Sequence, residues 1–210
     1  TVYSTLTAAS GKRHFKITSG AHRVSLSWLN MTGGNVGSSS DGGSIYVYNV
    51  AAHLNISHCV FFNNRARSGG AIYAYGGQAN LFFSFARFTE NKADWSGGAV
   101  NLVNAKLVDH SSMYNMNTAG YIGGALSLSS GSFSFFNSSL VSNTAGRRGG
   151  GIHIVGYYSE PSFLDMSSVT LQSNKQIVGG TYGQYGGGGL YLDQKVTANI
   201  RECTFIRNEA

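Results

Sequence analysis

Apolar and polar residues alternate with a period of two along most of the chain. Val100 and Leu102 flank Asn101, and Leu126 and Leu128 flank Ser127 in the same way. In an extended strand this period puts every second side chain on one face. No segment shows the 3.6-residue period of an amphipathic helix. The pattern predicts an all-β protein whose strands each bury one face.

The alternating segments recur as one repeated unit. Each unit opens with two glycines, a small residue and an aliphatic residue, as in Gly97-Gly98-Ala99-Val100, and later has an aromatic residue or Leu three places before an Asn. Successive glycine pairs are 27, 28, 26, 26 and 38 residues apart, which is the spacing of a repeat protein. The glycine pairs begin at Gly42, Gly69, Gly97, Gly123, Gly149 and Gly187, and the matching Asn residues are Asn64, Asn91, Asn117, Asn143, Asn174 and Asn208.

One unit of this length is too small to bury its own apolar face, so the units are expected to stack. Each strand would then pair with its counterpart one coil on, at roughly 4.8 Å. The predicted fold is a right-handed parallel β-helix, a solenoid of about six to seven three-strand coils of 26–28 residues each. The Asn column is expected to form a ladder of side-chain amides. The glycines suit corners that need positive φ or close backbone approach.

The paired GGA[ILV] and FxxN motifs resemble the repeats of the chlamydial polymorphic outer-membrane proteins and of related repeat proteins in algae and other protists. The resemblance covers about residues 41–210, with Leu at 140 and 171 in place of the aromatic residue and Gly at 151 and 189 in place of Ala. It implies a parallel β-helix, an extracellular or cell-surface location, and an adhesive or structural role.

The domain prediction is one solenoid preceded by a less regular segment. Residues 1–40 are expected to form an irregular first coil or cap region, and residues 41–210 the β-helix repeats of a piece of a longer chain. Cys59 and Cys203 occupy equivalent positions five coils apart, which is about 24 Å along the axis. They are therefore expected to be small core residues and not a disulfide.

Charge and composition restrict the partners. The net charge is +6 and the pI about 9.4, but no Lys/Arg run exceeds two residues, so nucleic acid is not expected as a partner. No stretch of eighteen apolar residues occurs, so no transmembrane segment is expected in this piece. A basic edge, either solvated or in contact with acidic glycans or subunits, is predicted just after the Asn corners from Arg65, Arg67, Lys92, Arg147, Arg148 and Lys175.

The acidic residues do not form an enzyme-like group. Nine Asp and Glu scatter over different repeat positions, and the six His have no metal-ligand spacing. We therefore expect no catalytic residue, no cofactor and no metal. One exception is Asp109, which stands in an inward column and needs a local donor or a strand bulge, or else serves as a catalytic carboxylate.

Two groups of residues are predicted to act at the surface. Sequons begin at Asn30, Asn55 and Asn137, and strand alternation turns Asn55 outward. The outward tyrosines after the glycine pairs would contact a partner or a sugar, or stack only on each other. The candidate contact residues are Tyr46, Tyr48, Tyr73 and Tyr75, together with Tyr157, Tyr158, Tyr182 and Tyr185 in the two insertions of the fifth unit.

The sequence leaves three functions open. The first is a non-enzymatic structural building block of an extracellular or cell-surface glycoprotein assembly, such as a filament, a ciliary hair or a wall layer, with other subunits as partners. The second is an adhesin stalk that binds a host receptor or glycan. The third is a polysaccharide-active β-helix enzyme, which the scattered acids disfavour.

Overall fold

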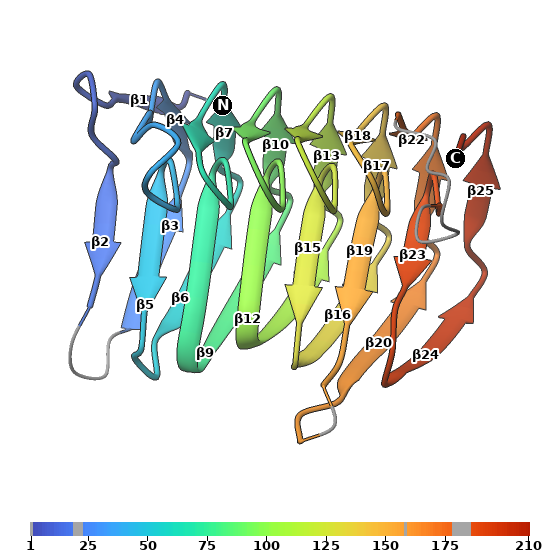
Figure 1. Cartoon of the computed structure of the whole chain (residues 1–210). Coiled ribbons are helices and arrows are strands. Elements are labelled where there is room, and N and C mark those ends of the chain that lie inside the picture. The colour runs from blue at the N-terminus through green and yellow to red at the C-terminus, as the bar shows by residue number, and fades with distance from the viewer. Residues whose placement is uncertain (1, 19–22, 158, 178–185) are drawn as a thin grey trace.

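The protein is a stack of parallel coils along a single axis. The computed structural model describes residues 2–18, 23–157, 159–177 and 186–210, and within these ranges it contains strands and no helix. Every pairing between named strands is parallel, and each strand pairs with its counterpart in a neighbouring coil. Figure 1 shows the coils side by side from the N-terminal to the C-terminal end. The predicted parallel β-solenoid is confirmed.

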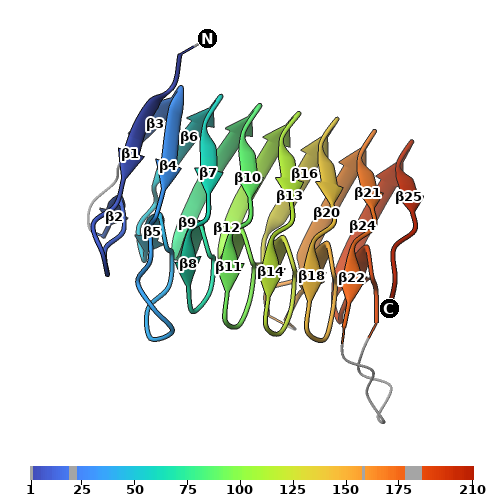
Figure 2. The same cartoon turned by 90° about the horizontal axis from the view of Figure 1, so that it is seen from above.

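Three sheets run along the stack, and Figure 2 shows them from above. Sheet A precedes the Asn corners and holds β1 (Ser4–Thr7), β4 (Leu29–Thr32), β7 (Val60–Phe62), β10 (Arg87–Thr89), β13 (Met113–Asn115), β17 (Ser139–Val141), β21 (Thr170–Gln172) and β25 (Thr204–Ile206). Sheet C follows the Asn corners and holds β8 (Arg65–Ala66), β11 (Lys92–Ala93), β14 (Thr118–Ala119), β18 (Thr144–Ala145) and β22 (Lys175–Gln176).

Sheet B follows the glycine pairs and has two rows of strands that meet at a corner. The first row holds β2 (Phe15–Ile17), β5 (Ile45–Tyr48), β9 (Ile72–Ser84), β12 (Val100–His110), β15 (Leu126–Ser129), β19 (Ile152–Val155) and β23 (Leu190–Leu192). The second row holds β3 (Arg23–Ser27), β6 (His53–Ser57), β16 (Ser132–Phe136), β20 (Ser162–Ser167) and β24 (Val196–Arg201), and β9 and β12 run through both rows.

The prediction of three strands per coil was wrong in one respect, because sheet C adds a fourth, two-residue strand. Its inward residue is a fully buried Ala in β8, β11 and β18. A side chain this small lets the chain stay in register with the neighbouring coils for two residues after the sharp Asn corner. The repeated motif ends at the Asn and so does not include this strand.

The core consists of like residues stacked from coil to coil. Phe61, Phe88 and Tyr114 lie one above another, with ring centroids 4.8 and 4.9 Å apart and planes within 6° and 3° of parallel. Leu54, Leu81 and other inward residues of sheet B are buried to the same extent as these three rings. Cys59 is buried, whereas Cys203 in the last described coil is half-exposed, and both are free thiols.

The two glycines of each pair have different roles, as the third unit shows. Gly97 has a φ of 64°, in the left-handed region that side chains disfavour. Gly98 has an ordinary φ, but a Cβ at this position would overlap the carbonyl oxygen of Gly124 in the next coil. Both reasons predicted from the sequence therefore apply, each to one glycine of the pair.

The six repeat Asn side chains form one continuous ladder. Asn117 Nδ2 donates to Asn143 Oδ1 at 3.0 Å and to the carbonyl of Phe88 at 2.9 Å. Asn117 Oδ1 in turn accepts hydrogen bonds from the Asn91 backbone N–H and side-chain amide, both at 3.0 Å. The same contacts recur from Asn64 to Asn208, and Asn64 through Asn174 are at most 1% exposed. Each amide thus satisfies a buried carbonyl and a buried N–H of the preceding coil and bonds the side-chain amide of the following coil.

The described part of residues 1–40 belongs to the same stack. Strands β2, β3 and β4 pair in register with β5, β6 and β7. Gly34 takes the place of a ladder Asn, and its N–H donates to Asn64 Oδ1 at 2.9 Å. The ladder is therefore capped by a backbone group on this side.

We expect Asn117→Ala to destabilise the protein more than Asn208→Ala. The first change leaves the Phe88 carbonyl and the Asn91 N–H without the Asn117 side chain and removes one of two donors to Asn143 Oδ1, whereas Asn208 is half-exposed and has no coil beyond it among the described residues. The expected cost of Asn117→Ala is about 1–3 kcal/mol in the free energy of unfolding, measured by urea denaturation. Equal losses for the two variants would contradict the ladder as a source of stability.

Candidate functional site

The described part of the chain contains no arrangement typical of a metal centre. No group of three or more His, Cys, Asp and Glu there is placed to hold a metal ion. The same residues include no helix that is long and apolar enough to span a membrane. The features that remain include a fully buried carboxylate, several aromatic surfaces, a rim of charged residues and several shallow hollows.

The buried carboxylate is Asp109 on β12. Its Oδ2 accepts hydrogen bonds from the Tyr114 hydroxyl at 3.0 Å and from Ser138 Oγ at 3.2 Å, while its Oδ1 is buried with no partner. Burial raises the pKa of Asp109 to about 6, against the opposing effect of hydrogen bonds from Ser112, Tyr114 and Ser138. Asp109 is 0% exposed, so its carboxyl group lies in the core beneath the surface.

The local donor expected for Asp109 is Tyr114, and the strand keeps its register there. Tyr114 is the only Tyr in the column that holds Phe or Leu elsewhere, and Asp109 is the only acid in its inward column. The two residues are five positions apart in one unit, which is the signal from which the pair could have been predicted.

Four of the predicted contact residues form a surface, here called the tyrosine surface, on the first row of sheet B. Tyr46 stacks on Tyr73 at 5.7 Å, and Tyr48 stacks on Tyr75 at 5.6 Å, with planes within 13° of parallel. Each stacked pair therefore covers one face of each ring, as one alternative from the sequence proposed. Tyr48 and Tyr75 remain 45% and 41% exposed.

The insertion residues lie elsewhere. Tyr157 is exposed at the tip of the insertion before β20, where it pairs with Glu160 through backbone hydrogen bonds of 2.9 and 3.0 Å. Tyr158, Tyr182 and Tyr185 lie outside the described residues. The structure thus brings together Tyr46, Tyr48, Tyr73 and Tyr75 but does not join Tyr157 to them.

Two further aromatic rows were not predicted. Trp28, His58 and Phe85 stack at 4.1 and 5.0 Å along the corner between sheets B and A. Trp95 and Tyr121 stack at 5.8 Å near sheet C, with the Arg147 guanidinium 3.9 Å from the Tyr121 ring. His58 and Phe85 both stand six residues before a repeat Asn, and Trp95 and Tyr121 both stand four after one. These shared positions in the repeat are the sequence signal from which the two aromatic rows could have been predicted.

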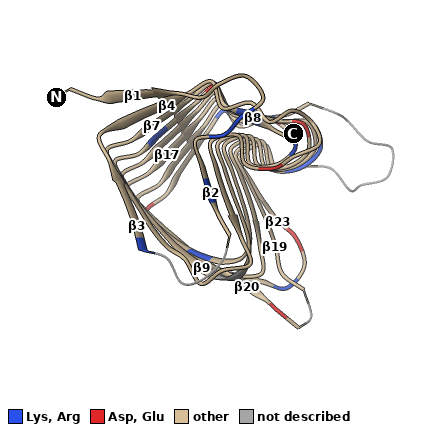
Figure 3. Cartoon of the chain, turned by 90° about the vertical axis from the view of Figure 1, so that its left-hand side faces the viewer, with Lys and Arg blue, Asp and Glu red and all other residues tan. Residues whose placement is uncertain are grey.

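The predicted basic edge is largely paired with acids. Figure 3, a view along the axis, shows red and blue segments together around β8 and the C-terminus. Arg65 bonds Asp94 at 3.0 Å, and Arg67 bonds Asp41 at 2.6 Å. Arg148 bonds Asp193 at 2.6 Å, and Lys175 bonds Glu209 at 2.8 Å. The acids come from neighbouring coils, so the sequence alone did not show that the edge would be neutralised.

His153 on β19 is the most buried histidine among the described residues. Its Nε2 lies 3.7 Å from Asp193 Oδ2, beyond hydrogen-bond length, and its ring stacks on Tyr191 at 5.6 Å. Burial lowers the pKa of His153 to about 4, which the Asp193 carboxylate opposes and Arg148 reinforces. Burial is the main cause of this lowered pKa, and the Asp193 carboxylate is already paired with Arg148. The His153 ring is therefore neutral at neutral pH and packs against Tyr191.

The three sequons differ in access. Asn55 on β6 and Asn137 at the corner after β16 are exposed. Asn30 on β4 is half-buried between Thr5 and Val60 of the flanking strands, and its Oδ1 is buried without a partner. Only the first two have free space for a glycan.

Comparison with known proteins gives one match. Residues 58–75 match the family model of the Chlamydia polymorphic membrane protein repeat. This segment of the chain is therefore similar to the repeat of that family. The matched segment contains Phe61, Asn64 and the run Gly69-Gly70-Ala71-Ile72, the motifs on which the resemblance was predicted. No curated protein and no solved structure matches the chain significantly. In this polymorphic membrane protein repeat, Asn64 supplies the first side chain of the ladder.

Asp109 should make stability fall as the pH rises. Its folded-state pKa is about 6 and its ordinary value is 3.8, so its contribution is fully present below about pH 4 and is lost as the pH rises to about 6. We expect Asp109→Asn to remove this loss and to be more stable than the natural chain at pH 7 by up to ~3 kcal/mol. Urea denaturation at pH 4 and pH 7 measures the difference. A difference of the same size at both pH values would contradict the prediction.

Glycan occupancy should follow side-chain access. After secretion from a eukaryotic host, we expect Asn55→Gln and Asn137→Gln each to lower the intact mass by one glycan. Asn30→Gln is the matched control and should leave the glycan mass unchanged, because Asn30 is half-buried. Intact-mass spectrometry before and after deglycosylation tests this, and a glycan found at Asn30 alone would contradict it.

Proposed function

We propose that the chain is a non-enzymatic, rigid building block of an extracellular or cell-surface glycoprotein assembly, such as a filament, a ciliary hair or a wall layer. Its partners are other protein subunits that pack along the solenoid. The repeat match supports placement at a cell surface, because the matched family is described as a membrane protein repeat. The exposed sequon residues Asn55 and Asn137 fit a secreted glycoprotein.

The observation that carries the proposal is the distribution of exposed aromatic side chains. Trp95 is 60% exposed and Phe85 is 53% exposed, and they belong to rows that lie on different sides of the solenoid from the tyrosine surface. Aromatic residues in exposed groups are typical of protein contact surfaces. Contact surfaces on several sides of one solenoid favour an assembly in which subunits pack side by side. Binding of a single receptor would require only one such surface.

The form of these rows favours protein partners over sugars. The tyrosine rings stack on each other in pairs, so each ring has one face covered and its orientation fixed before a partner binds. Such a rigid, amphipathic surface loses little side-chain entropy when another subunit covers it. The ladder and the stacked core keep the rows straight, which a repeating assembly requires.

Negative-stain imaging of the intact protein from its native source tests the proposal. We expect filaments or ordered arrays. Hydroxyl-radical labelling should then be lower at Trp95, Tyr48 and Tyr75 in the assembled material than in dispersed protein, because subunits cover these rings. Phe82, an exposed ring on the second row of sheet B, is the internal control and should be labelled equally in both.

Separate rods with unchanged labelling would contradict the structural role. They would favour the alternative of an adhesin stalk, for which the exposed insertion carrying Tyr157 is the supporting observation.

A further inference from the structure

Phe163 differs from the other exposed aromatic residues because its neighbours along the stack are small. It points outward from β20 and is 50% exposed. In the adjacent coils, its register partners are Ser132 on β16 and Thr197 on β24. The rings of the tyrosine surface cover each other, whereas no aromatic neighbour covers Phe163 among the described residues. Its ring therefore keeps a face open to solvent.

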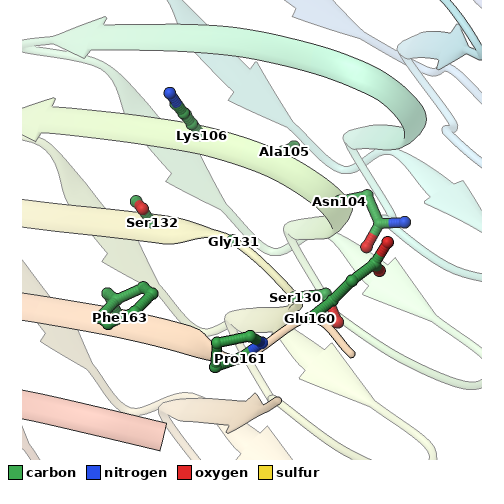
Figure 4. A pocket seen from close by; sticks show the side chains of 9 residues that line it. All are labelled: Asn104, Ala105, Lys106, Ser130, Gly131, Ser132, Glu160, Pro161 and Phe163. Atoms are coloured by element: carbon green, nitrogen blue, oxygen red, sulfur yellow. The ribbon is translucent and has the colours of Figure 1, made fainter. Parts of the chain in front are cut away.

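Two hollows adjoin this ring. One has a volume of about 280 Å³ and is lined by residues of β12, of the β15–β16 corner and of the insertion before β20. The other, of about 260 Å³, extends toward Thr197 and Asn199 of β24. Both are lined by Ser132 and Phe163, so together they form one shallow trough, here called the Phe163 trough. Figure 4 shows Lys106, Ser132 and Phe163 in a row on adjacent strands, with Glu160 and Asn104 at one end.

The trough offers hydrogen-bonding groups beside the ring. Ser130 lines the first hollow, but its Oγ is buried beneath the surface, so the groups that face a ligand come from other wall residues. Asn104, Ser132, Ser134 and Asn199 add amides and hydroxyls along the walls.

The charges in the trough balance. Lys106 and Glu160 line the first hollow. Asp165 lines the second and is bonded to Arg201 at 3.2 Å. Two cations and two carboxylates leave no net charge to select an anionic or a cationic ligand. A ligand rich in hydroxyl groups, with one apolar face and no charge, matches this surface.

We propose that the Phe163 trough binds a neutral saccharide, with one sugar ring packed on the open face of Phe163. The sugar hydroxyls then bond Asn104, Ser132 and the Glu160 carboxylate in the first hollow. The following sugar lies toward Ser134 and Asn199. This site is separate from the aromatic rows that carry the proposed assembly, so a subunit of the assembly holds glycan while its other faces contact protein.

Titration of the chain with neutral hexasaccharides of β-1,4-glucan, β-1,3-glucan, mannan and galactan tests the proposal, followed by calorimetry and saturation-transfer NMR. We expect at least one of them to bind with a Kd of about 1 mM or tighter. Phe163→Ala should weaken that binding by about tenfold or more, because the stacking ring is lost. Phe163→Tyr keeps the ring and should bind as the natural chain does.

Phe82→Ala is the matched control, because Phe82 is a 43% exposed Phe on the same row of sheet B but outside the trough. It should leave binding unchanged, and the melting temperature of each variant shows that it folds. Absence of binding by all four saccharides at about 10 mM would overturn the proposal. Equal binding by Phe163→Ala, or binding of a heparin hexasaccharide alone, would do the same. None of these outcomes changes whether negative-stain images show filaments or arrays. The saccharide site and the structural role in an assembly can therefore be overturned independently of each other.

Discussion

The structure depends on the hydrogen bonds between one coil and the next, made by the strand backbones and continued at the corner by the Asn ladder. Each ladder amide contacts both neighbours, as Asn117 does with Asn91 and Asn143. These bonds hold equivalent residues of successive coils at one register. Since a shift by a single residue would turn every side chain to the opposite face, the ladder and the apolar columns specify the same alignment.

This alignment also decides the surface chemistry. Because equivalent residues lie next to each other, repeated tyrosines become a stack, and an Arg in one coil meets an Asp in the next, as Arg65 meets Asp94. The same rule explains the exception at Phe163, where the neighbouring coils supply Ser132 and Thr197. In a solenoid, aromatic residues at the same position of successive coils therefore stack on one another. An aromatic residue whose neighbours in the adjacent coils are small keeps a ring face exposed.

The core tolerates one departure from its apolar pattern. Asp109 and Tyr114 occupy positions that are apolar in the other units, and they satisfy each other through a 3.0 Å hydrogen bond. Removing only one of them would leave the other polar group buried in an otherwise apolar stack. The pair shows that an inward column accepts a polar side chain when a hydrogen-bond partner lies beside it in the core.

The sequence by itself determined the fold class, the phase of the coils, the position of every ladder Asn and the two roles of the corner glycines. It did so because period-two alternation and a fixed repeat length leave one way to bury all the apolar columns. Only the tertiary structure decided what lies across from each side chain on the surface. The ion pairs of Arg67 and Lys175, the unpartnered hydroxyl of Ser130 and the open ring of Phe163 arise between coils. Such contacts depend on distances and side-chain directions that the repeat pattern does not encode.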